Sequence, residues 1–213
     1  MTFRVFGLTG GMASGKTTVA GRFRARGLSV LEADQLAREV VEPERPAFAQ
    51  IVQEFGVEFL RPDGKLDRCR LAREVFACPN SRKLLESIIH PQVRALAQSR
   101  LDALAESGES WACYETPLLF EVGLAETVRP VIVVVASEAR QLERAAWRDG
   151  STPDEVRARL SAQMPLAAKA QLANYVIDND GPLEQTLAQA DRVLDAVSRD
   201  FGVALNGSEG ESP

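Results

Sequence analysis

The sequence predicts a layered α/β domain built on a mainly five-stranded parallel sheet. Strand-like segments alternate with helical patterns along the chain. The strand-like segments cover residues 3–9, 28–33, 111–115, 128–136 and 175–177. The stretch Val131–Val135 contains only β-branched apolar residues, which is typical of a central strand buried on both faces. Because strands and helices alternate, the sequence favours crossover helices and therefore a parallel sheet.

A glycine-rich loop follows the first strand-like segment and fits the pattern G-x-x-x-x-G-K-[ST]. Its residues are Gly10, Gly11, Met12, Ala13, Ser14, Gly15, Lys16 and Thr17. Glycines in this pattern let backbone N–H groups point at phosphate oxygens, and the lysine brings positive charge to the β- and γ-phosphates. The threonine hydroxyl is offered to Mg²⁺, and the following helix directs its positive dipole end at the same anion. With a strand before it and a helix after it, the loop predicts a P-loop NTPase-type fold that binds a nucleoside triphosphate.

The second strand-like segment leads into Asp34, a candidate general base. Phosphate sites in such sheets lie beyond the carboxyl ends of the strands, where Asp34 could accept a proton from an incoming hydroxyl. Two other roles fit the same position. Asp34 could cap a helix that begins at Gln35, or bind Mg²⁺ through water. Position alone favours the cap, and cap and base are compatible.

A helical lobe is predicted within about residues 43–107. About 77 residues separate the second and third strand-like segments, more than one crossover helix requires. The expected helices cover residues 46–55, 68–76, 81–89 and 92–107, with a turn at Asp63 and Gly64 between the first two. This lobe is the predicted place for an acceptor substrate.

A lid is predicted over about residues 144–170, where cations gather around a glycine. The cations are Arg144, Arg148, Arg157, Arg159 and Lys169. Gly150 ends a helix predicted over residues 138–148, and Thr152 with Glu155 forms a capping box for the next helix, which starts at Pro153. A cationic, glycine-hinged segment is typical of a lid that closes over phosphates, and an ordinary solvated helix pair is the alternative.

The end of the chain predicts one amphipathic helix at about residues 183–201 and a polar, disordered tail at residues 206–213. Residues 1–205 are therefore expected to form one domain. Two acids near the end of the third strand-like segment, Glu115 and Glu121, could orient Mg²⁺ through water or lie on the surface as solvated acids.

Composition excludes several classes of protein. The formal net charge of −5 argues against a broad cationic surface for nucleic acid. The three cysteines are odd in number and lack C-x-x-C spacing, so neither a disulfide framework nor a four-thiolate metal site is indicated. No apolar signal segment is present, and the apolar run at residues 131–136 is too short to span a bilayer. A cytoplasmic protein without a membrane partner is expected.

Further short motifs follow the glycine-rich loop in order along the chain. They are residues 32–38 (EADQLAR), 64–68 (GKLDR) with Val75 and Phe76, 90–91 (HP), 117–121 (PLLFE), 141–149 (QLERAAWRD), Gln163 and 177–179 (IDN). Together with residues 8–18 (LTGGMASGKTT), this set resembles the dephospho-coenzyme A kinase family from about Phe3 to the final helix. Two positions depart from the family pattern: Glu32 replaces an Asp, and Asn174 stands where an Asp is usual.

The resemblance implies transfer of the γ-phosphate of ATP to the ribose 3′-hydroxyl of dephospho-coenzyme A, with Mg²⁺ bound at the donor. The implied site residues are grouped by role: residues 10–18, which end at Thr18, with Asn179 for ATP; Thr17 for the metal; Lys16, Asp34 and Arg144 or Arg148 for catalysis; and Asp34, Arg38, Arg68 and His90 for the acceptor. The sequence leaves His90 two roles, substrate positioning and a structural role at a helix start with Pro91.

Two other functions remain open from the sequence. One is a different small-molecule P-loop kinase that acts on a nucleoside, nucleotide or sugar hydroxyl. The other is a nucleotide-dependent switch protein, against which stand the lack of an [NT]-K-x-D signature and the position of the only D-x-x-G element, residues 178–181, far from the loop. The oligomeric state is open as well, with a monomer favoured.

Overall fold

The structure is a computed structural model, and it describes residues 2–150 and 152–204. The chain divides into two compact units. Unit 1 combines the chain up to Leu31 with the chain from Ser107 onward, and unit 2 consists of Glu32–Glu106. The predicted disordered tail, residues 206–213, lies outside the described residues. This division does not test whether residues 1–205 fold as one domain, and that stays a prediction.

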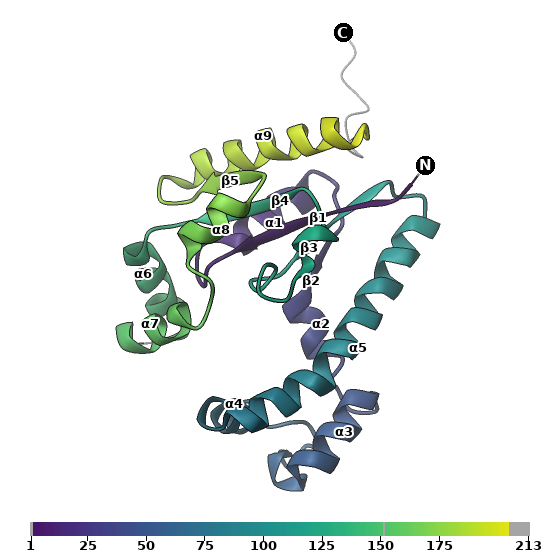
Figure 1. The fold of residues 1–213 in the computed structure, drawn as a ribbon, viewed down its shortest axis with the longest axis vertical. Coiled ribbons are helices and arrows are strands. Elements are labelled where there is room, and N and C mark those ends of the chain that lie inside the picture. Colours follow the sequence, from purple (N-terminus) through teal and green to yellow (C-terminus); the bar gives the residue numbers. More distant parts are fainter. Residues whose placement is uncertain (1, 151, 205–213) are drawn as a thin grey trace. The chain divides into compact units, whose positions relative to one another are not determined.

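Unit 1 is built on a five-stranded parallel sheet (Figure 1), which confirms the predicted fold class. The strands are β1 (Arg4–Gly10), β2 (Val30–Glu32), β3 (Trp111–Glu115), β4 (Val131–Val135) and β5 (Tyr175–Asp178). Their order is β2-β3-β1-β4-β5, so β1 lies at the centre between β3 and β4. Crossovers leave β1 on both sides, and ligands in such sheets bind at this point, beyond the carboxyl end of the central strand.

Helices pack on this sheet and join its distant segments. They are α1 (Lys16–Ala25), α6 (Glu138–Asp149), α7 (Pro153–Ser161), α8 (Leu166–Leu172) and α9 (Leu183–Phe201), with a 3-10 turn η2 (Leu124–Glu126). Helix α9, yellow in Figure 1, packs against β5 and α1, and α8 packs against β4. Ion pairs add to the contact of α1 with α9, since Arg22 and Arg26 both bind Asp191, at 2.8 and 2.9 Å.

An aromatic cluster fills the core beneath β1. The fully buried ring of Phe6 meets Phe23 of α1 edge to face at 5.9 Å and Trp111 of β3 at 5.6 Å between ring centroids. Phe201 at the end of α9 closes the cluster against Trp111 at 6.0 Å. Full burial of one such side chain contributes roughly 1.5–3 kcal/mol. Strand β1, which leads into the glycine-rich loop, is therefore fixed by a well-packed core.

Unit 2 is helical and covers most of the region in which the sequence predicts an inserted lobe, which stays a prediction. Its elements are α2 (Ala33–Glu39), α3 (Pro46–Phe55), η1 (Val57–Phe59), α4 (Arg68–Ala77) and α5 (Pro79–Glu106). Helix α5 packs against α2, α3 and α4 around a core that includes Val41, Ile51, Leu71 and Ile88. The sequence placed the start of the lobe at about residue 43. Because α2 packs on α5, the compact unit begins at Glu32 instead.

One helix prediction is wrong. The sequence predicts two helices, at residues 81–89 and 92–107, whereas the structure has the single helix α5 with Pro91 inside it. Proline cannot donate a backbone hydrogen bond and disfavours a helix interior by about 3 kcal/mol. Apolar side chains on both sides of Pro91 pack at helical spacing into one core, and this packing outweighs the proline. These side chains are Leu85, Ile88, Ile89, Val93, Leu96 and Ala97. A helix-start role for His90 and Pro91 is therefore excluded.

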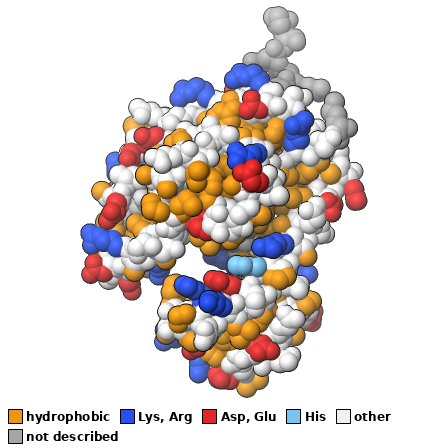
Figure 2. Space-filling model, in the orientation of Figure 1, with side chains coloured by type: hydrophobic (Ala, Val, Ile, Leu, Met, Phe, Trp, Pro, Cys, Tyr) orange, Lys and Arg blue, Asp and Glu red, His pale blue; other side chains and the backbone are white. Residues whose placement is uncertain are grey.

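Two surface properties bear on partners. None of the helices in the described residues is long and apolar enough to cross a bilayer. On the face of the molecule drawn in Figure 2, Lys and Arg side chains are interspersed with acidic and apolar ones. That face presents no broad basic area of the kind that a nucleic acid backbone requires.

Candidate active site

The glycine-rich loop forms a tight turn between β1 and α1. The N–H of Ser14 donates to the Gly11 carbonyl at 3.2 Å, and the N–H groups of Thr18 and Val19 donate to the Gly15 carbonyl. Gly15 has φ of 100° and Ala13 has φ of 55°, both in the left-handed region. Glycine adopts this region without strain. The loop therefore curls directly into the first turn of α1, which begins at Lys16.

Two of the loop glycines lie too close to their neighbours for any side chain. A Cβ atom at Gly15 would lie 1.8 Å from Asn179 Nδ2, and one at Gly10 would lie 2.5 Å from the Val134 carbonyl oxygen. A Cβ atom at Gly11 would lie 2.7 Å from Gln141 Oε1. The approaches at Gly10 and Gly15 show why these two positions of the pattern need glycine, quite apart from the phosphate, whereas the Gln141 side chain could shift to admit a side chain at Gly11.

Asn179, the residue that follows β5, holds the glycine-rich loop in place. Its side chain is almost fully buried and donates from Nδ2 to the Ser14 carbonyl at 2.8 Å. Its Oδ1 accepts from Thr186 Oγ1, also at 2.8 Å, which fixes the orientation of the amide. The sequence predicts Asn179 as a contact of the donor. The structure gives its side chain a second role, holding the loop, and the donor contact stays a prediction.

Arg144 of α6 also binds the loop. Its Nη1 donates to the Ser14 carbonyl at 3.4 Å and its Nη2 donates to the Asn179 carbonyl at 2.8 Å. Two backbone carbonyls from segments about 165 residues apart thus meet one guanidinium. Arg144 therefore places positive charge at the loop while it joins the loop to the segment after β5.

A cavity of about 280 Å³ opens beside the loop and gathers cations. It is lined by Ala13, Gly15, Lys16, Thr17, Thr18, Arg144, Trp147 and Arg148. Lys16 Nζ donates to the Gly11 carbonyl at 3.1 Å, so the ammonium lies over the loop. Trp147 is 90% exposed, which is rare for so large an apolar side chain. The structure thus brings together Lys16, Arg144 and Arg148, as the sequence predicts.

The loop fits an anionic ligand with oxygen atoms. Among the buried polar atoms of the described chain, Ser14 Oγ and Gln141 Oε1 have no hydrogen-bond partner. Ser14 Oγ would lie 2.6 Å from a Cβ atom on Gly10, so this hydroxyl faces the loop and can donate to a phosphate oxygen. Gln141 Oε1 would lie 2.7 Å from a Cβ atom on Gly11, but as an amide oxygen it only accepts and so does not bind an anion itself. In the described ranges no group of three or more His, Cys, Asp or Glu residues could hold a metal ion. A metal at this site would need oxygen ligands from the phosphates and from the exposed Thr17 hydroxyl.

The structure contains the local features predicted for residues 144–170, while a lid that closes over phosphates stays a prediction. Thr152 and Glu155 form the predicted capping box, with Pro153 at the first helical position, and Gly150 ends α6 with φ of 64°. Arg157 forms ion pairs with Glu138 of α6 and with Asp154 of its own helix, α7. Of the five cations, Arg144 and Arg148 line the loop cavity.

Lys169 and Glu121 contradict their predicted roles. The Lys169 side chain is fully buried, donates to the Pro117 carbonyl at 2.6 Å and pairs with Glu121 at 2.8 Å. Burial opposes ionisation of Glu121, but hydrogen bonds from Lys169 and from the Met164 N–H outweigh it and hold the pKa of this carboxyl below its usual value. Lys169 is thus a buried anchor of α8 and not a lid cation, and Glu121 is its counter-ion and not a candidate for Mg²⁺.

In unit 2, the N-cap prediction for Asp34 is wrong. Helix α2 begins at Ala33, two residues earlier than expected, and its N-cap is Glu32 without a side-chain cap bond. Asp34 lies in the first turn, exposed, and within the described residues it makes no hydrogen bond or ion pair. Its carboxylate is therefore available to a ligand.

The other acceptor residues predicted in unit 2 are all exposed. Arg38 and Arg68 line a second cavity, of about 460 Å³, while His90 lies in the middle of α5 and is not among the residues that line it. The structure therefore brings Arg38 and Arg68 together, and Arg68 Nη2 donates to the Arg38 carbonyl at 3.1 Å.

Several contacts at the site were missed by sequence reasoning. The amide of Asn179 on Ser14, the carboxamide of Gln141 beside Gly11 and the pair of Lys169 with Glu121 carried no local signal. Asn174, which departs from the family pattern, accepts from the Val131 N–H at 2.8 Å and so replaces one carbonyl at the start of β4. An Asp could accept the same bond, so the departure is conservative in this contact.

Comparisons with known proteins agree with this geometry. A family profile described as Dephospho-CoA kinase matches residues 4–185. A curated relative named Dephospho-CoA kinase from Anaeromyxobacter dehalogenans is 49% identical over 191 residues, which is 90% of each chain. Among solved structures, TT1252 from Thermus thermophilus aligns with a TM-score of 0.80 and 34% identity over 92% of this chain and 98% of that chain. Dephospho-CoA kinase from Campylobacter jejuni aligns with a TM-score of 0.68 and 26% identity over 92% of this chain and 97% of that chain. From its matched length, its identity to curated relatives and its glycine-loop geometry, the chain belongs to the dephospho-CoA kinase family.

Proposed function

We propose that the chain transfers the γ-phosphate of ATP to the ribose 3′-hydroxyl of dephospho-coenzyme A and gives coenzyme A and ADP. Family membership supports the identity of the donor and acceptor. One structural observation carries the chemistry: three cations, Lys16, Arg144 and Arg148, line a single cavity beside the braced loop. Phosphoryl transfer depends mainly on positioning and charge stabilisation, and this arrangement supplies both.

On the donor side, the loop amides and Lys16 would hold the β- and γ-phosphates. Thr17 would hold Mg²⁺ together with phosphate oxygens, and the bound ion would neutralise charge that develops on the transferring group. The exposed Thr17 hydroxyl and the cluster-free surroundings support this set of ligands. Mg²⁺ and the cytoplasmic location both stay proposals.

Arg144 and Arg148 would have different roles in the donor site. Arg144 already donates to two backbone carbonyls, which supports a role in positioning the loop. Arg148 is exposed at the mouth of the same cavity, which favours it as the group that contacts the transferring phosphoryl. This proposal resolves an assignment that the sequence leaves open between the two.

On the acceptor side, Asp34 would take the proton of the 3′-hydroxyl. Its position supports this, because it follows β2 by two residues and its carboxylate makes no bond within the described residues. A general base must be free to accept a proton. His90 would contact the acceptor without a role in proton transfer, since phosphoryl transfer to an alcohol needs only one base.

The proposed function is tested by ADP formation from ATP with and without dephospho-coenzyme A, and by identification of the phosphorylated product. We expect strong stimulation by the acceptor and a product that carries phosphate at the 3′ position. ADP formation that does not depend on the acceptor would contradict the proposal.

Asp34→Asn tests the base. We expect kcat to fall by about 10²-fold, because general base catalysis contributes 10²–10⁴-fold, with little change in the KM for ATP. Asp102→Asn is the matched control, since Asp102 is an exposed acid of unit 2 that accepts a hydrogen bond from Gln98 Nε2 on its own helix. A Kd for ATP that weakens as much as kcat falls would point to a metal-binding or structural role for Asp34.

A further inference from the structure

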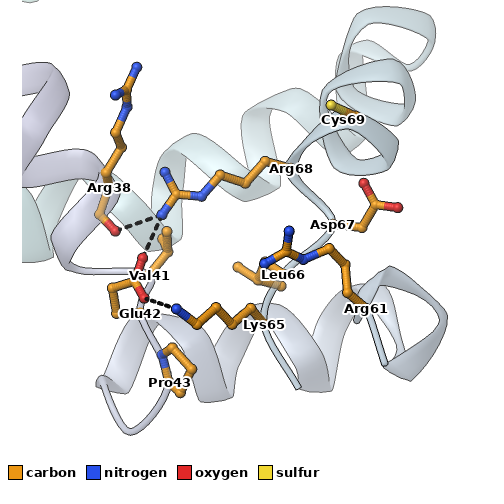
Figure 3. Close-up of a pocket in the computed structure, with 10 residues that line it drawn as sticks. All are labelled: Arg38, Val41, Glu42, Pro43, Arg61, Lys65, Leu66, Asp67, Arg68 and Cys69. Carbon is orange, nitrogen blue, oxygen red and sulfur yellow. Dashed lines mark hydrogen bonds and ion pairs between the residues drawn. The ribbon is translucent and has the colours of Figure 1, made fainter. Parts of the chain in front are cut away.

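A second cavity lies wholly within unit 2 and is lined by an unusual set of charges (Figure 3). It has a volume of about 460 Å³. Its lining residues are Arg38, Val41, Glu42, Pro43, Arg61, Lys65, Leu66, Asp67, Arg68 and Cys69. Four of these are cations and two are acids, so the cavity carries an excess of positive charge. The sequence analysis predicts Arg38 and Arg68 as acceptor contacts, and Lys65, Leu66 and Asp67 belong to the motif at residues 64–68.

One of the two acids is already used by the fold. Asp67 is the N-cap of α4 and accepts from the Arg70 N–H at 2.9 Å. Arg61 is paired with Asp63 at 2.8 Å, outside the lining of the cavity. The remaining acid, Glu42, is therefore the main anion available to the cations Lys65 and Arg68.

Glu42 lies between these two cations. Its carboxylate accepts from Arg68 Nη2 at 2.8 Å and lies 3.9 Å from Lys65 Nζ. In Figure 3 the two cations reach the carboxylate from different sides, while the guanidinium of Arg38 points away from it. All three side chains of the triad are 44–54% exposed, so ligands from solvent can reach them. A carboxylate held in this way occupies the place that a phosphate oxygen of a ligand would take.

The backbone beneath the cations is fixed. A hairpin-like turn joins Arg61 and Lys65, because the Arg61 N–H donates to the Lys65 carbonyl at 2.8 Å and Gly64 adopts φ of 78°. Arg68 is held by a second bond from Nη2 to the Arg38 carbonyl at 3.1 Å. Leu66, only 5% exposed, anchors the turn in the core of unit 2. The backbone positions of Lys65 and Arg68 are therefore defined, although the charged ends of their side chains are exposed to solvent.

We propose that this cavity binds the diphosphate group of the acceptor, with Lys65 and Arg68 as its main contacts and Glu42 as an internal counter-ion that the ligand displaces. The inference rests on the proposed function, which supplies an acceptor with a 5′-diphosphate. Guanidinium groups suit phosphate oxygens because they donate in a planar fork. The diphosphate does not react, so these contacts contribute to binding of the acceptor equally before and during the reaction.

The test is calorimetric binding of dephospho-coenzyme A to the full chain with the donor site filled by a non-hydrolysable ATP analogue. Arg68→Ala should weaken the Kd by about tenfold, since one charge-assisted contact is worth about 1.4 kcal/mol or more. Glu42→Gln should tighten the Kd about two- to threefold, because it removes a carboxylate that competes with the ligand for weakly screened, half-exposed cations. The two variants lie in one cavity and shift the Kd in opposite directions, which a general loss of folding cannot do.

Arg82→Ala is the control, since Arg82 is an exposed arginine of unit 2 that pairs with Glu86 on α5 and does not line the cavity. Its Kd should match that of the original chain within twofold. Equal Kd values for all the proteins, or weaker binding by Glu42→Gln, would overturn the inference. Turnover is measured separately. A chain that binds dephospho-coenzyme A without phosphorylating it contradicts the proposed function. In that case the Kd values of the variants still test whether the cavity binds the diphosphate.

Discussion

The donor loop of unit 1 and the charged cavity of unit 2 are built in different ways. The loop is held by backbone groups and buried side chains: Asn179 binds the Ser14 carbonyl, and a Cβ atom on Gly15 has no room. The cavity is held together by exposed ion pairs, such as Arg68 with Glu42. We infer that the reacting phosphate is held by a rigid site, whereas a non-reacting part of the acceptor needs only charge of the right sign.

The energetic scales of the two regions differ accordingly. Leaving a buried hydrogen-bonding group without its partner costs about 1–3 kcal/mol. An exposed ion pair contributes roughly 0–1 kcal/mol. Changes in the loop should therefore reduce both stability and activity, whereas changes in the cavity of unit 2 should shift acceptor binding alone.

The largest effect is expected for Lys16→Ala in the loop. Loss of a charge directed at the developing transition state should lower kcat by about 10²-fold or more. Steady-state kinetics with both substrates saturating measures this effect. Lys65→Ala, a lysine of unit 2, is the counterpart and should raise the KM for the acceptor with a much smaller change in kcat. A Lys16→Ala enzyme with a nearly normal kcat would remove the contrast between the two regions.

Gly15→Ala should be nearly as severe. The new methyl group would need φ of 100° and would collide with Asn179 Nδ2, so we expect loss of ATP binding and a destabilisation of at least about 1 kcal/mol. Gly21→Ala is the matched control, because Gly21 lies inside α1 with open space around its Cβ position. It should raise stability by about 0.5–1 kcal/mol. Thermal unfolding and ATP titration of both variants test this, and equal effects of the two substitutions would contradict the close approach.

A smaller and more selective effect separates the two arginines of the cavity beside the loop. Arg148→Ala should lower kcat by about tenfold or more with little change in the KM for ATP, because its proposed contact forms mainly in the transition state. Arg144→Ala should also lower the melting temperature and weaken ATP binding, because it removes the guanidinium that donates to the Asn179 carbonyl and, beside Asn179 Nδ2, to the Ser14 carbonyl. Parallel changes in kcat, KM and melting temperature for both variants would show that the roles are not divided.

The smallest effect concerns acid stability of unit 1. Hydrogen bonds from Arg22 and then Arg26 outweigh burial and hold the pKa of Asp191 below its usual value. A lowered pKa in the folded state gives stability that is present above the unfolded pKa of about 3.9 and is lost as the pH falls through the folded pKa. Asp191→Asn should therefore lower the melting temperature at pH 7 and flatten its fall below about pH 4. Asp102→Asn, on an exposed face of unit 2, should leave the pH profile unchanged, and identical profiles for both variants would refute the role of Asp191.

Local patterns in the sequence predict much of the fold and of the donor loop. Val131–Val135 forms a buried central strand because its apolar run leaves no polar face, and residues 10–17 form the loop because their glycines and Lys16 each meet a local requirement. The sequence also predicts the capping box at Thr152 from residues only three positions apart.

The start of α2 was misplaced by two residues, which is a local error, whereas the other errors and omissions depend on contacts between distant parts of the chain. Pro91 stays inside a helix because side chains from other helices of unit 2 pack on both sides of it. Lys169 turns inward because Glu121, 48 positions away, receives it, and Asn179 meets a carbonyl 165 positions away. No local pattern records such pairs, so the structure was needed to find them.

Titration of ATP into the folded chain, with and without Mg²⁺, tests the central claim most directly, namely that the braced loop of unit 1 is the donor site. We predict binding that Mg²⁺ strengthens in the original chain, that Gly15→Ala abolishes and that Gly21→Ala retains. Folded protein that takes up no ATP, or a Gly15→Ala variant that binds ATP as well as the original chain does, would contradict the account.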